Sequence, residues 1–310
     1  MTVGVTGANG FIGRAVCRML LERGHAVRGF ARRLERSVPG VDYVLVPNCG
    51  PDTQWGAALE GCAAIVHLAA RVHVPGRGTP ASDALFYDIN VGGTERLGRQ
   101  CVANGVSTFV HLSSMAAVTL TSAVPVDETI MPSPVGHYGR SKLLSEEVVH
   151  EVFSGTGSRA VVLRPPMVYG PGAPGNFALL RRAVAWGFPL PFGSIDNRRS
   201  FLFVENLVDA IGRCLEVTSA RAVYHVSDGG DLSTPDFTRR LARAAGKRPR
   251  LVRMPPAILK AIGTLGGFER SVQSLIGTLV VDGGRFRSDL AWSPPYSVDE
   301  GLARSVATRS

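Results

Sequence analysis

The chain has 310 residues, of which 45% are hydrophobic and 19% charged, and its formal net charge is +9. This composition is sufficient for a packed core. At about 150 residues per domain, the length fits two domains or one large α/β domain with an appendage. No uninterrupted apolar run reaches the roughly 20 residues that a membrane-spanning helix needs, and the first residues do not have the form of a signal peptide. We therefore expect a cytoplasmic protein without membrane insertion.

The cysteine, histidine and basic residues bear on the compartment of the protein and on whether it binds metal or nucleic acid. The five cysteines are scattered without a C-x-x-C pair, and the histidines show no metal-ligand spacing, so we predict a reducing compartment and no metal site. The basic residues come in short pairs without interleaved aromatic residues, which argues against nucleic acid as a partner. Residues 255–268 form an apolar segment around Lys260, for which we favour a core-facing helix over a membrane-surface patch.

Short apolar runs alternate with helical patterns in the first half of the chain. Strands are predicted at 2–5, 25–30, 64–68, 108–112 and 160–163, and helices at 14–22, 90–104 and 139–153. Strands separated by helices indicate right-handed βαβ units, and therefore an α/β fold with a doubly wound parallel sheet of the Rossmann type.

The regular alternation of apolar runs and helical patterns ends after residue 164. Six prolines and many glycines interrupt the periodicity up to residue 191, which predicts a loop-rich region. A helix at 204–216 and a strand at 222–226 follow, and later helices are predicted at 235–245 and 297–306. We expect a dinucleotide-binding domain of residues 1–164, rejoined by about 198–226. A smaller, mostly C-terminal α/β substrate domain would comprise residues 165–197 and 227–310.

The segment Thr6–Gly13 carries a G-x-x-G-x-x-G motif between the first predicted strand and the first helix. In such a motif the first glycine permits a tight turn, the second lets the backbone approach a pyrophosphate, and the third lets the helix pack closely. An anion binds there because the helix N-terminus presents free N–H groups. The flanking strand and helix favour a dinucleotide site over an unrelated Gly-rich turn. We predict cofactor contacts from Gly7, Asn9, Gly10, Phe11, Ile12 and Gly13.

The end of the second predicted strand bears on the choice of cofactor. An acidic residue there would accept a hydrogen bond from the ribose 2′-OH of NAD, whereas arginine suits the 2′-phosphate of NADP. This chain has Arg32 and Arg33 at that point and no acid before Glu35. We therefore favour NADP(H), with NAD(H) as the alternative if both arginines only face solvent.

Tyr138 and Lys142 lie four residues apart at the start of a predicted helix, which places them on one helix face. A tyrosine has a pKa of about 10, and a nearby ammonium group lowers it. Tyr138 would then act as general acid or base toward a C–OH or C=O group, and Lys142 would contact the nicotinamide ribose. Alone the Y-x-x-x-K pattern is weak evidence, but it is strong when it follows the dinucleotide loop.

These motifs together resemble the extended short-chain dehydrogenases/reductases of the NAD-dependent epimerase/dehydratase family, over nearly the whole chain. The segments that carry the resemblance are Thr6–Gly13, His67–Ala70, Asn90–Thr94, Leu112–Ser114, Tyr138–Lys142, Arg164–Gly172 and Arg199–Ala210. The resemblance implies that Leu68, Ala69, Ala70 and Pro165 lie at the cofactor. It also implies substrate-side roles: Asn90 buttresses the active site, Asn176 contacts the nucleotide, and Arg199 binds the sugar-nucleotide diphosphate.

Two positions depart from the family pattern. The active-site Ser or Thr of the family aligns with Met115, so Ser114, Ser113 or Thr119 would supply the hydroxyl, unless the substrate is oriented without one beside Met115. Met167 stands where 4-epimerases have Asn. Both changes, and the segment 227–234, resemble a branch that handles bacterial surface-polysaccharide precursors.

The resemblance implies chemistry at C4 of a nucleotide-linked sugar. We favour reduction of a UDP-4-keto-6-deoxy-hexosamine because of Arg32 and Arg33, and a UDP-sugar 4-epimerase with bound NAD is the alternative. Two further alternatives are a reductase of a non-nucleotide carbonyl, for which Arg199 would be dispensable, and a non-catalytic dinucleotide sensor, against which the intact Tyr138 and Lys142 argue. Relatives pair through helices like 90–104 and 139–153, so the resemblance implies a homodimer.

Overall fold

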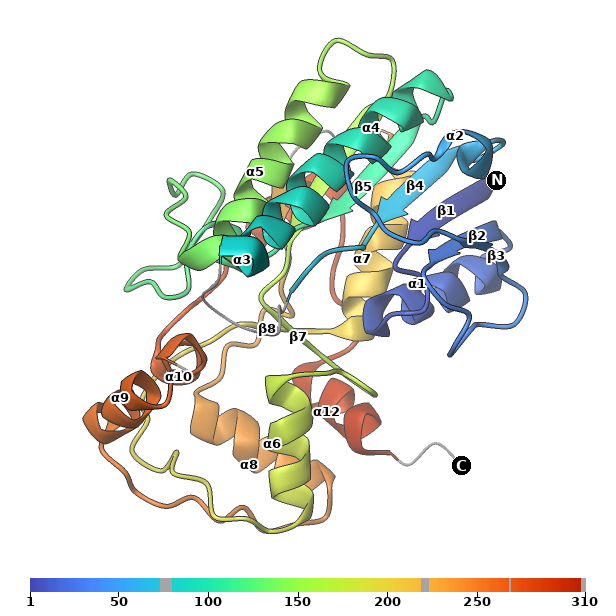
Figure 1. The fold of residues 1–310 in the computed structure, drawn as a ribbon. Coiled ribbons are helices and arrows are strands. Elements are labelled where there is room, and N and C mark those ends of the chain that lie inside the picture. The colour runs from blue at the N-terminus through green and yellow to red at the C-terminus, as the bar shows by residue number, and fades with distance from the viewer. Residues whose placement is uncertain (73–79, 219–222, 268, 308–310) are drawn as a thin grey trace.

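The computed structural model describes residues 1–72, 80–218, 223–267 and 269–307. Its main feature is a parallel sheet of seven strands in the order β3-β2-β1-β4-β5-β6-β9 (Figure 1). The strands are β1 (Thr2–Thr6), β2 (Ala26–Ala31), β3 (Asp42–Leu45), β4 (Ala64–His67), β5 (Thr108–Leu112), β6 (Arg159–Arg164) and β9 (Val223–His225). The strand order reverses between β1 and β4, and this arrangement confirms the predicted Rossmann-type fold.

Helices cover both faces of the sheet (Figure 1). On one face α1 (Phe11–Glu22) packs beside α7 (Val204–Glu216), and on the other α4 (Gly93–Ala103) packs beside α5 (Gly136–Phe153). Alternation along the strands supplies the two cores: Val66 and Val110 belong to the α1 side, whereas Ile65 and Phe109 belong to the α5 side. Strands buried on both faces explain the continuous apolar runs in the sequence.

A second, mostly helical part lies below the C-terminal end of the sheet (Figure 1). Its helices are α6 (Asn176–Ala185), α8 (Thr234–Ala244), α9 (Pro256–Leu265), α10 (Glu269–Ile276) and α12 (Val298–Val306). The short sheet of β7 (Met167–Tyr169) and β8 (Phe201–Phe203) lies at the junction. Asp228 ties this junction together, because its carboxylate accepts hydrogen bonds from the Phe203 amide at 2.9 Å and from the Asn206 side chain at 2.7 Å.

Shorter elements complete the described chain. They are α2 (Gly56–Leu59), α3 (Pro80–Tyr87), a π-helical turn (Asp88–Gly92), a 3₁₀ turn (Met115–Ala117) and α11 (Gly284–Leu290). Several of these were not predicted, nor were β3, β7, β8 and α10. The region 165–197, predicted to be loop-rich, contains β7 and the helix α6. Its prolines lie outside that helix, and Gly175, with φ of 68°, precedes it.

Several predicted boundaries differ from the structure by one to three residues. The helix expected at 90–104 begins as the π-helical turn, and only its later part is α4. The predicted starting residue 222 of the last strand and the predicted end 268 of the apolar helix lie outside the described residues. The core-facing orientation predicted for 255–268 is wrong for most of α9, because only Leu259 and Gly263 are buried.

Candidate active site

The glycine loop forms a tight cradle at the start of α1. Gly7 has φ of +66°, a conformation that favours glycine, and a Cβ on Gly13 would lie 2.1 Å from the Gly7 carbonyl oxygen. No side chain caps the N-terminus of α1, and its first turn holds no acidic residue. The backbone N–H groups that begin with Phe11 and Ile12 are therefore available to an anion.

Thr6 joins this loop to the end of β4. Its hydroxyl accepts hydrogen bonds from the amides of Leu68 and Ala69, each at 3.0 Å, and donates to His67 Nδ1 at 2.8 Å. His67 Nε2 then donates to Thr94 Oγ1 at 2.9 Å. Burial, helped by the charge of Lys142, lowers the pKa of His67 to about 3, so this imidazole stays neutral and holds one tautomer.

Asn90 carries the same network to the tyrosine helix. It accepts from the backbone amide of Arg71 at 2.7 Å, and its amide group donates to the Arg71 carbonyl and to Ser141 Oγ. Ser141 donates in turn to the carbonyl of Tyr138 at 2.9 Å. Both amide hydrogens of Asn90 are used and the residue is 1% exposed. The buttressing role is supported, whereas a direct contact with substrate does not fit this burial.

Tyr138 meets a serine hydroxyl at the start of α5. The Ser114 hydroxyl caps the 3₁₀ turn by accepting from the Ala116 amide at 3.1 Å, and it lies close enough to Tyr138 to lower the pKa of that phenol. Gly139 makes this contact possible, since a Cβ there would lie 2.4 Å from the Ala116 carbonyl oxygen. Burial raises the pKa of Tyr138, and the hydrogen bond from Ser114 opposes that rise.

Lys142 is buried one turn along α5. Its amino group donates to the Leu112 carbonyl at 2.7 Å and lies 3.4 Å from His111 Nε2. Burial lowers the pKa of Lys142 to about 8, and the nearby carboxylate of Glu146 acts in the opposite direction. The pKa of Tyr138 is raised, and Ser114 rather than Lys142 opposes the rise, so the expectation that this ammonium lowers the pKa of Tyr138 is wrong.

The side chains of Ser113 and Met115 are buried in contacts with other residues of the protein. The Ser113 hydroxyl donates to the buried carboxylate of Glu146, which also forms an ion pair with Arg164. Met115 is 2% exposed and packs with Val118, Val126, Leu279 and Val281. The predicted substrate contact of Met115 therefore does not fit the structure, and of the two adjacent serines only Ser114 presents its hydroxyl to Tyr138.

The two arginines after β2 are exposed beside the glycine loop. Asn9 donates to the backbone carbonyl of Arg33 at 2.8 Å, which connects the loop to the end of β2. The Arg33 side chain is 77% exposed and lies 3.9 Å from the Glu35 carboxylate. Arg32 is exposed as well. Both side chains can therefore reach a ligand at this edge, and neither is held in a preformed anion site.

The remaining four predicted contact residues lie in four different places. Arg199 donates to the Gly277 carbonyl at 2.8 Å, and burial lowers its pKa to about 10. Asn176 is exposed at the first residue of α6. Pro165 is buried after β6, where its carbonyl accepts from the Met115 amide at 2.9 Å. Ala70 is partly buried directly after Ala69, next to the glycine loop.

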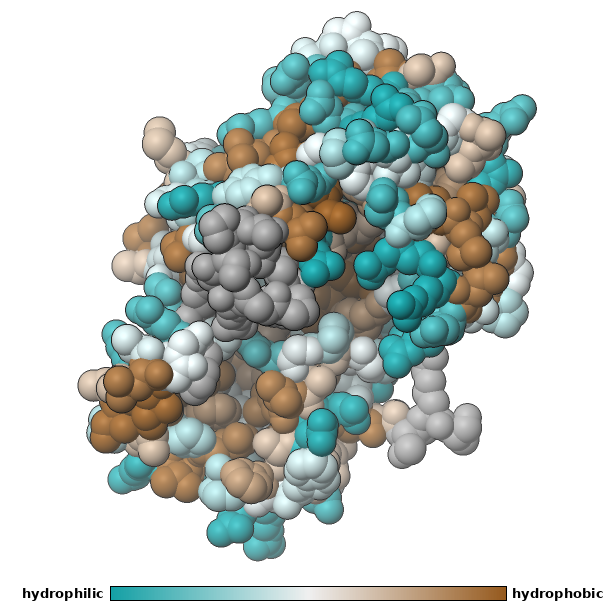
Figure 2. Space-filling model, viewed as in Figure 1, coloured by the Kyte–Doolittle hydropathy of each residue, from teal (hydrophilic) through white to brown (hydrophobic). Residues whose placement is uncertain are grey.

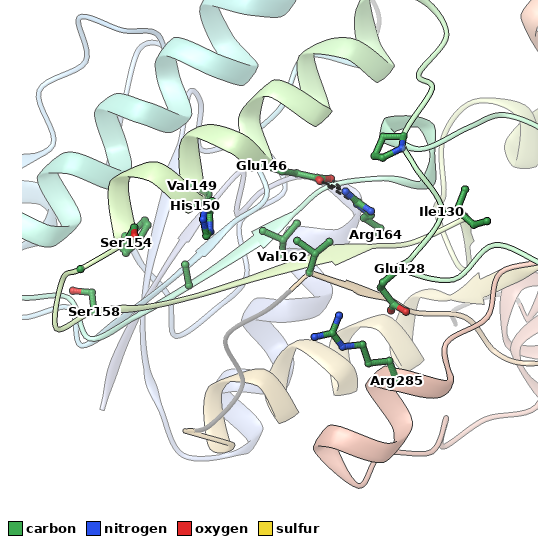
Figure 3. Close-up of a pocket in the computed structure, with 15 residues that line it drawn as sticks. Glu128, Ile130, Glu146, Val149, His150, Ser154, Ser158, Val162, Arg164 and Arg285 are labelled. Carbon is green, nitrogen blue, oxygen red and sulfur yellow. Dashed lines mark hydrogen bonds and ion pairs between the residues drawn. The ribbon is translucent and has the colours of Figure 1, made fainter.

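A separate pocket of about 570 Å³ opens on the face of β6 that carries α5. Figure 3 shows Glu146 and Arg164 paired at one end, with Glu128 and Arg285 near its rim and Ser154 and Ser158 at the other end. Neither Tyr138, Lys142 nor the glycine loop lines this pocket. It is therefore distinct from the candidate site, although the Glu146–Arg164 pair borders both.

Thr6, His111 and Glu146 are site residues that the sequence analysis did not identify. Glu146 carried a usable signal, because it follows Lys142 by four residues and so shares its helix face. The roles of Thr6 and His111 depend on contacts across neighbouring strands, which spacing does not reveal.

Comparison with known proteins agrees with this geometry. The family model "NAD dependent epimerase/dehydratase family" matches residues 3–227. A UDP-glucose 4-epimerase of Vibrio cholerae is 33% identical over 307 residues, which cover 97% of this chain and 93% of that protein. The N-acetyl-α-D-glucosaminyl-diphospho-ditrans,octacis-undecaprenol 4-epimerase of Escherichia coli O157:H7 is 28% identical over 268 residues, covering 80% of this chain and 78% of that protein. MoeE5, solved in complex with UDP-glucuronic acid and NAD, is 25% identical with a TM-score of 0.81, covering 99% and 98% of the two chains.

The fold and site define an NAD-dependent extended short-chain dehydrogenase/reductase. The chain belongs to the NAD-dependent epimerase/dehydratase family, and this confirms the family resemblance and the enzyme class predicted from its motifs. The predicted preference for NADP(H) finds no support here, because the cofactor named in the MoeE5 complex is NAD. In the described part of the chain, no helix is long and apolar enough to cross a membrane.

Proposed function

We propose that the protein is a 4-epimerase that acts at C4 of a UDP-linked sugar with bound NAD. The observation that carries this proposal is the placement of Ser114 beside Tyr138, one helical turn from Lys142, on a helix that is joined to the glycine loop through Asn90, His67 and Thr6. The likeness to the Vibrio UDP-glucose 4-epimerase over 97% of this chain supports the choice of reaction.

The residues present fit a nicotinamide dinucleotide. The glycine cradle leaves no room for a Cβ at Gly13, and the uncapped start of α1 suits a pyrophosphate. Such a cofactor, when bound, supplies reversible hydride exchange. Gly7, Gly10 and Gly13 would admit its diphosphate, and Leu68 and Ala69 would line it.

The protein side chains handle the proton and the orientation of the sugar. Tyr138 exchanges a proton with the C4 oxygen, and Ser114 holds that oxygen by a second hydrogen bond. Lys142 keeps a positive charge beneath the site, and this charge favours the phenolate when the ligand excludes water. Arg199 is proposed to bind the diphosphate of the substrate and Asn176 its nucleotide. A homodimer through α4 and α5 belongs to the same proposal and is testable by light scattering.

A 4-ketoreductase that consumes NADPH is the second candidate. The observation that favours it is the pair of exposed arginines, Arg32 and Arg33, at the edge of β2 where an acidic residue would select NAD. Both reactions use the same Tyr138, Ser114 and Lys142. They differ in whether the cofactor is recycled or consumed.

The two candidates separate in one experiment. We would incubate the purified protein with UDP-glucose, UDP-galactose and their N-acetylated forms without added cofactor, and follow the sugar by NMR. Interconversion of C4 epimers, with NAD released on denaturation, supports the epimerase. Stoichiometric loss of NADPH absorbance with a UDP-4-keto sugar, and no interconversion, would establish the reductase instead.

Substitutions test the roles of the side chains. Tyr138→Phe should lower kcat about 100- to 10,000-fold, the range for loss of a general acid–base, whereas Tyr87→Phe on α3 should not. Ser114→Ala should lower kcat while the fold stays intact, and Ser113→Ala should mainly lower stability. Full activity of Tyr138→Phe would refute the mechanism.

The carrier of the sugar is a further point of the proposal. The Escherichia coli relative is named for a sugar diphosphate on undecaprenol. We favour UDP because the Vibrio relative matches more of this chain. A polyprenyl-diphosphate sugar belongs in the same substrate panel.

A further inference from the structure

The helix α9 turns an apolar face to solvent. Ile258, Ile262 and Leu265 recur at a spacing of four and three residues and are 48%, 45% and 90% exposed. Ala257 and Ala261 are exposed on the same helix. Only Leu259 and Gly263 are buried, against a small core that includes Phe192 and Ile195. A helix packed solely for stability would bury its large aliphatic residues, so this face calls for another explanation.

The chain around α9 is strongly basic. Residues 237–268 contain eight Lys and Arg residues and no Asp or Glu, so this tenth of the chain carries most of the net charge of +9. Arg239 and Arg240 pair with Asp236 and Asp299. The other six form no ion pair within the part of the chain that the structure describes. They are Arg243, Lys247, Arg248, Arg250, Arg253 and Lys260, and all are exposed.

The basic segment and the apolar face are fixed on the same part of the fold. Leu251 forms a bridge with Leu190, and the Val252 amide donates to the Leu190 carbonyl at 2.8 Å. Leu251, Met254 and Leu259 belong to one apolar cluster, which anchors the strand-like segment and the helix that follows it. Figure 2 shows a hydrophobic patch at the lower left, where Figure 1 places α9 and α10.

We propose that this α9 surface, formed by Ile258, Ile262 and Leu265 with Lys247, Arg248, Arg250 and Arg253, docks on the anionic surface of a lipid bilayer. A short helix with exposed aliphatic side chains inserts shallowly among the acyl chains, and nearby Lys and Arg residues bind the acidic headgroups. A nucleic acid would satisfy the charges but offers nothing to the apolar face. The proposal does not depend on the sugar substrate, since none of these residues lies in the candidate active site.

The test is co-sedimentation of the full chain with lipid vesicles. We expect binding to an equal mixture of phosphatidylcholine and phosphatidylglycerol, weaker binding in high salt, and little binding to phosphatidylcholine alone. The triple change Arg248→Ser, Arg250→Ser, Arg253→Ser should lower the partition coefficient about 100-fold, at about fivefold per basic residue. The triple change Ile258→Ser, Ile262→Ser, Leu265→Ser should lower it at least about 30-fold.

Matched variants remove the same groups elsewhere on the surface. The change Arg36→Ser, Arg99→Ser, Arg285→Ser alters the net charge equally, and Leu45→Ser, Val124→Ser, Met131→Ser removes three side chains that are 57%, 56% and 86% exposed. Both controls should sediment like the unmodified protein.

The outcomes of this experiment distinguish a lipid bilayer from other partners of the α9 surface. Equal binding of neutral and anionic vesicles, or full vesicle binding by the Ile258, Ile262 and Leu265 variant, would overturn the proposal. Loss of binding only in the arginine variant, with competition by DNA, would identify a general polyanion surface and also overturn it. Turnover of a soluble UDP-sugar without vesicles should be the same in all variants. A failure of the proposed function would therefore appear there and leave the sedimentation result unaffected.

Discussion

Neutralising Glu146 tests the buried ion pair beneath the candidate site. The side chains of Glu146 and Arg164 are 4% and 8% exposed, and the Arg164 Nη2–Glu146 Oε2 distance is 2.5 Å. Two further contacts from Arg164 Nε, both 3.0 Å, make the pair multidentate, and Ser113 donates to the same carboxylate. In Glu146→Gln the guanidinium stays buried, 3.4 Å from His225 Nε2, without a counter-charge.

The expected loss follows from this geometry. Breaking a buried pair by removing one charge costs roughly 3–5 kcal/mol, and we expect the lower end because glutamine keeps one acceptor oxygen. At roughly 2–4 °C per kcal/mol, the unfolding midpoint should fall by about 6–12 °C. The carboxylate of Glu146 also raises the pKa of Lys142. Its loss should therefore move the pKa of Lys142 below about 8 and shift the alkaline limb of the activity profile to lower pH.

Calorimetry and a pH–rate profile measure the two effects, with Glu147→Gln as the control. Glu147 is the next residue of α5 and is exposed, so its change should move the midpoint by no more than about 2 °C. The double change Glu146→Leu, Arg164→Met should recover much of the loss, because an apolar pair needs no counter-charge. A loss below about 1 kcal/mol in Glu146→Gln, or a double variant no more stable than the single one, would refute this account of the pair.

Three further changes probe other parts of the same framework. Gly13→Ala should weaken NADH binding at least about 100-fold in a fluorescence titration, because its Cβ would lie 2.1 Å from the Gly7 carbonyl oxygen, whereas Gly56→Ala meets open space and should bind normally. Burial raises the pKa of Asp228 to about 6. The stability that this group contributes is therefore greatest below about pH 4 and falls by about 3 kcal/mol as the pH rises through 6. Denaturation at several pH values should show this fall in the unmodified protein and not in Asp228→Asn. Thr6→Val leaves the amides of Leu68 and Ala69 without an acceptor and should lower the free energy of unfolding in denaturant by about 2–4 kcal/mol. An unchanged midpoint would show that water replaces the hydroxyl.

The fold was predictable where the sequence repeats a physical pattern. The helix 204–216 and the strand 108–112 match the structure, because the helix has a strong apolar periodicity and the strand is a buried, mostly apolar run. The edge strand β3 was missed although three of its residues belong to the apolar run Tyr43–Val46, because the strand has only four residues and its side chains are partly or fully exposed. The helix α6 was missed because the prolines on either side dominated its context, although its own ten residues contain none.

The candidate site divides in the same way. The glycine loop and the Tyr138–Lys142 pair depend on local spacing, and the structure brings both to the C-terminal edge of the sheet. Which serine faces Tyr138 was not predictable, because Ser113 and Ser114 are neighbours and only the burial of Glu146 distinguishes them. The pKa of Tyr138 was predicted in the wrong direction, because helix spacing says nothing about where the Lys142 amino group points, and it points to the Leu112 carbonyl.

One hydrogen-bonded path explains why the two halves of the site hold a fixed relation. It runs from Thr6 beside the glycine loop through His67 and Asn90 to the backbone of Tyr138, and every donor in it has one acceptor. A protonated His67 would present a second donor to Thr6 and break this order, but burial lowers its pKa to about 3, so the imidazole is neutral and the path intact near neutral pH. A hydride can pass between nicotinamide and sugar only within a narrow range of distances. In the reaction proposed above, the neutral histidine would contribute rigidity, and Tyr138 would transfer the proton.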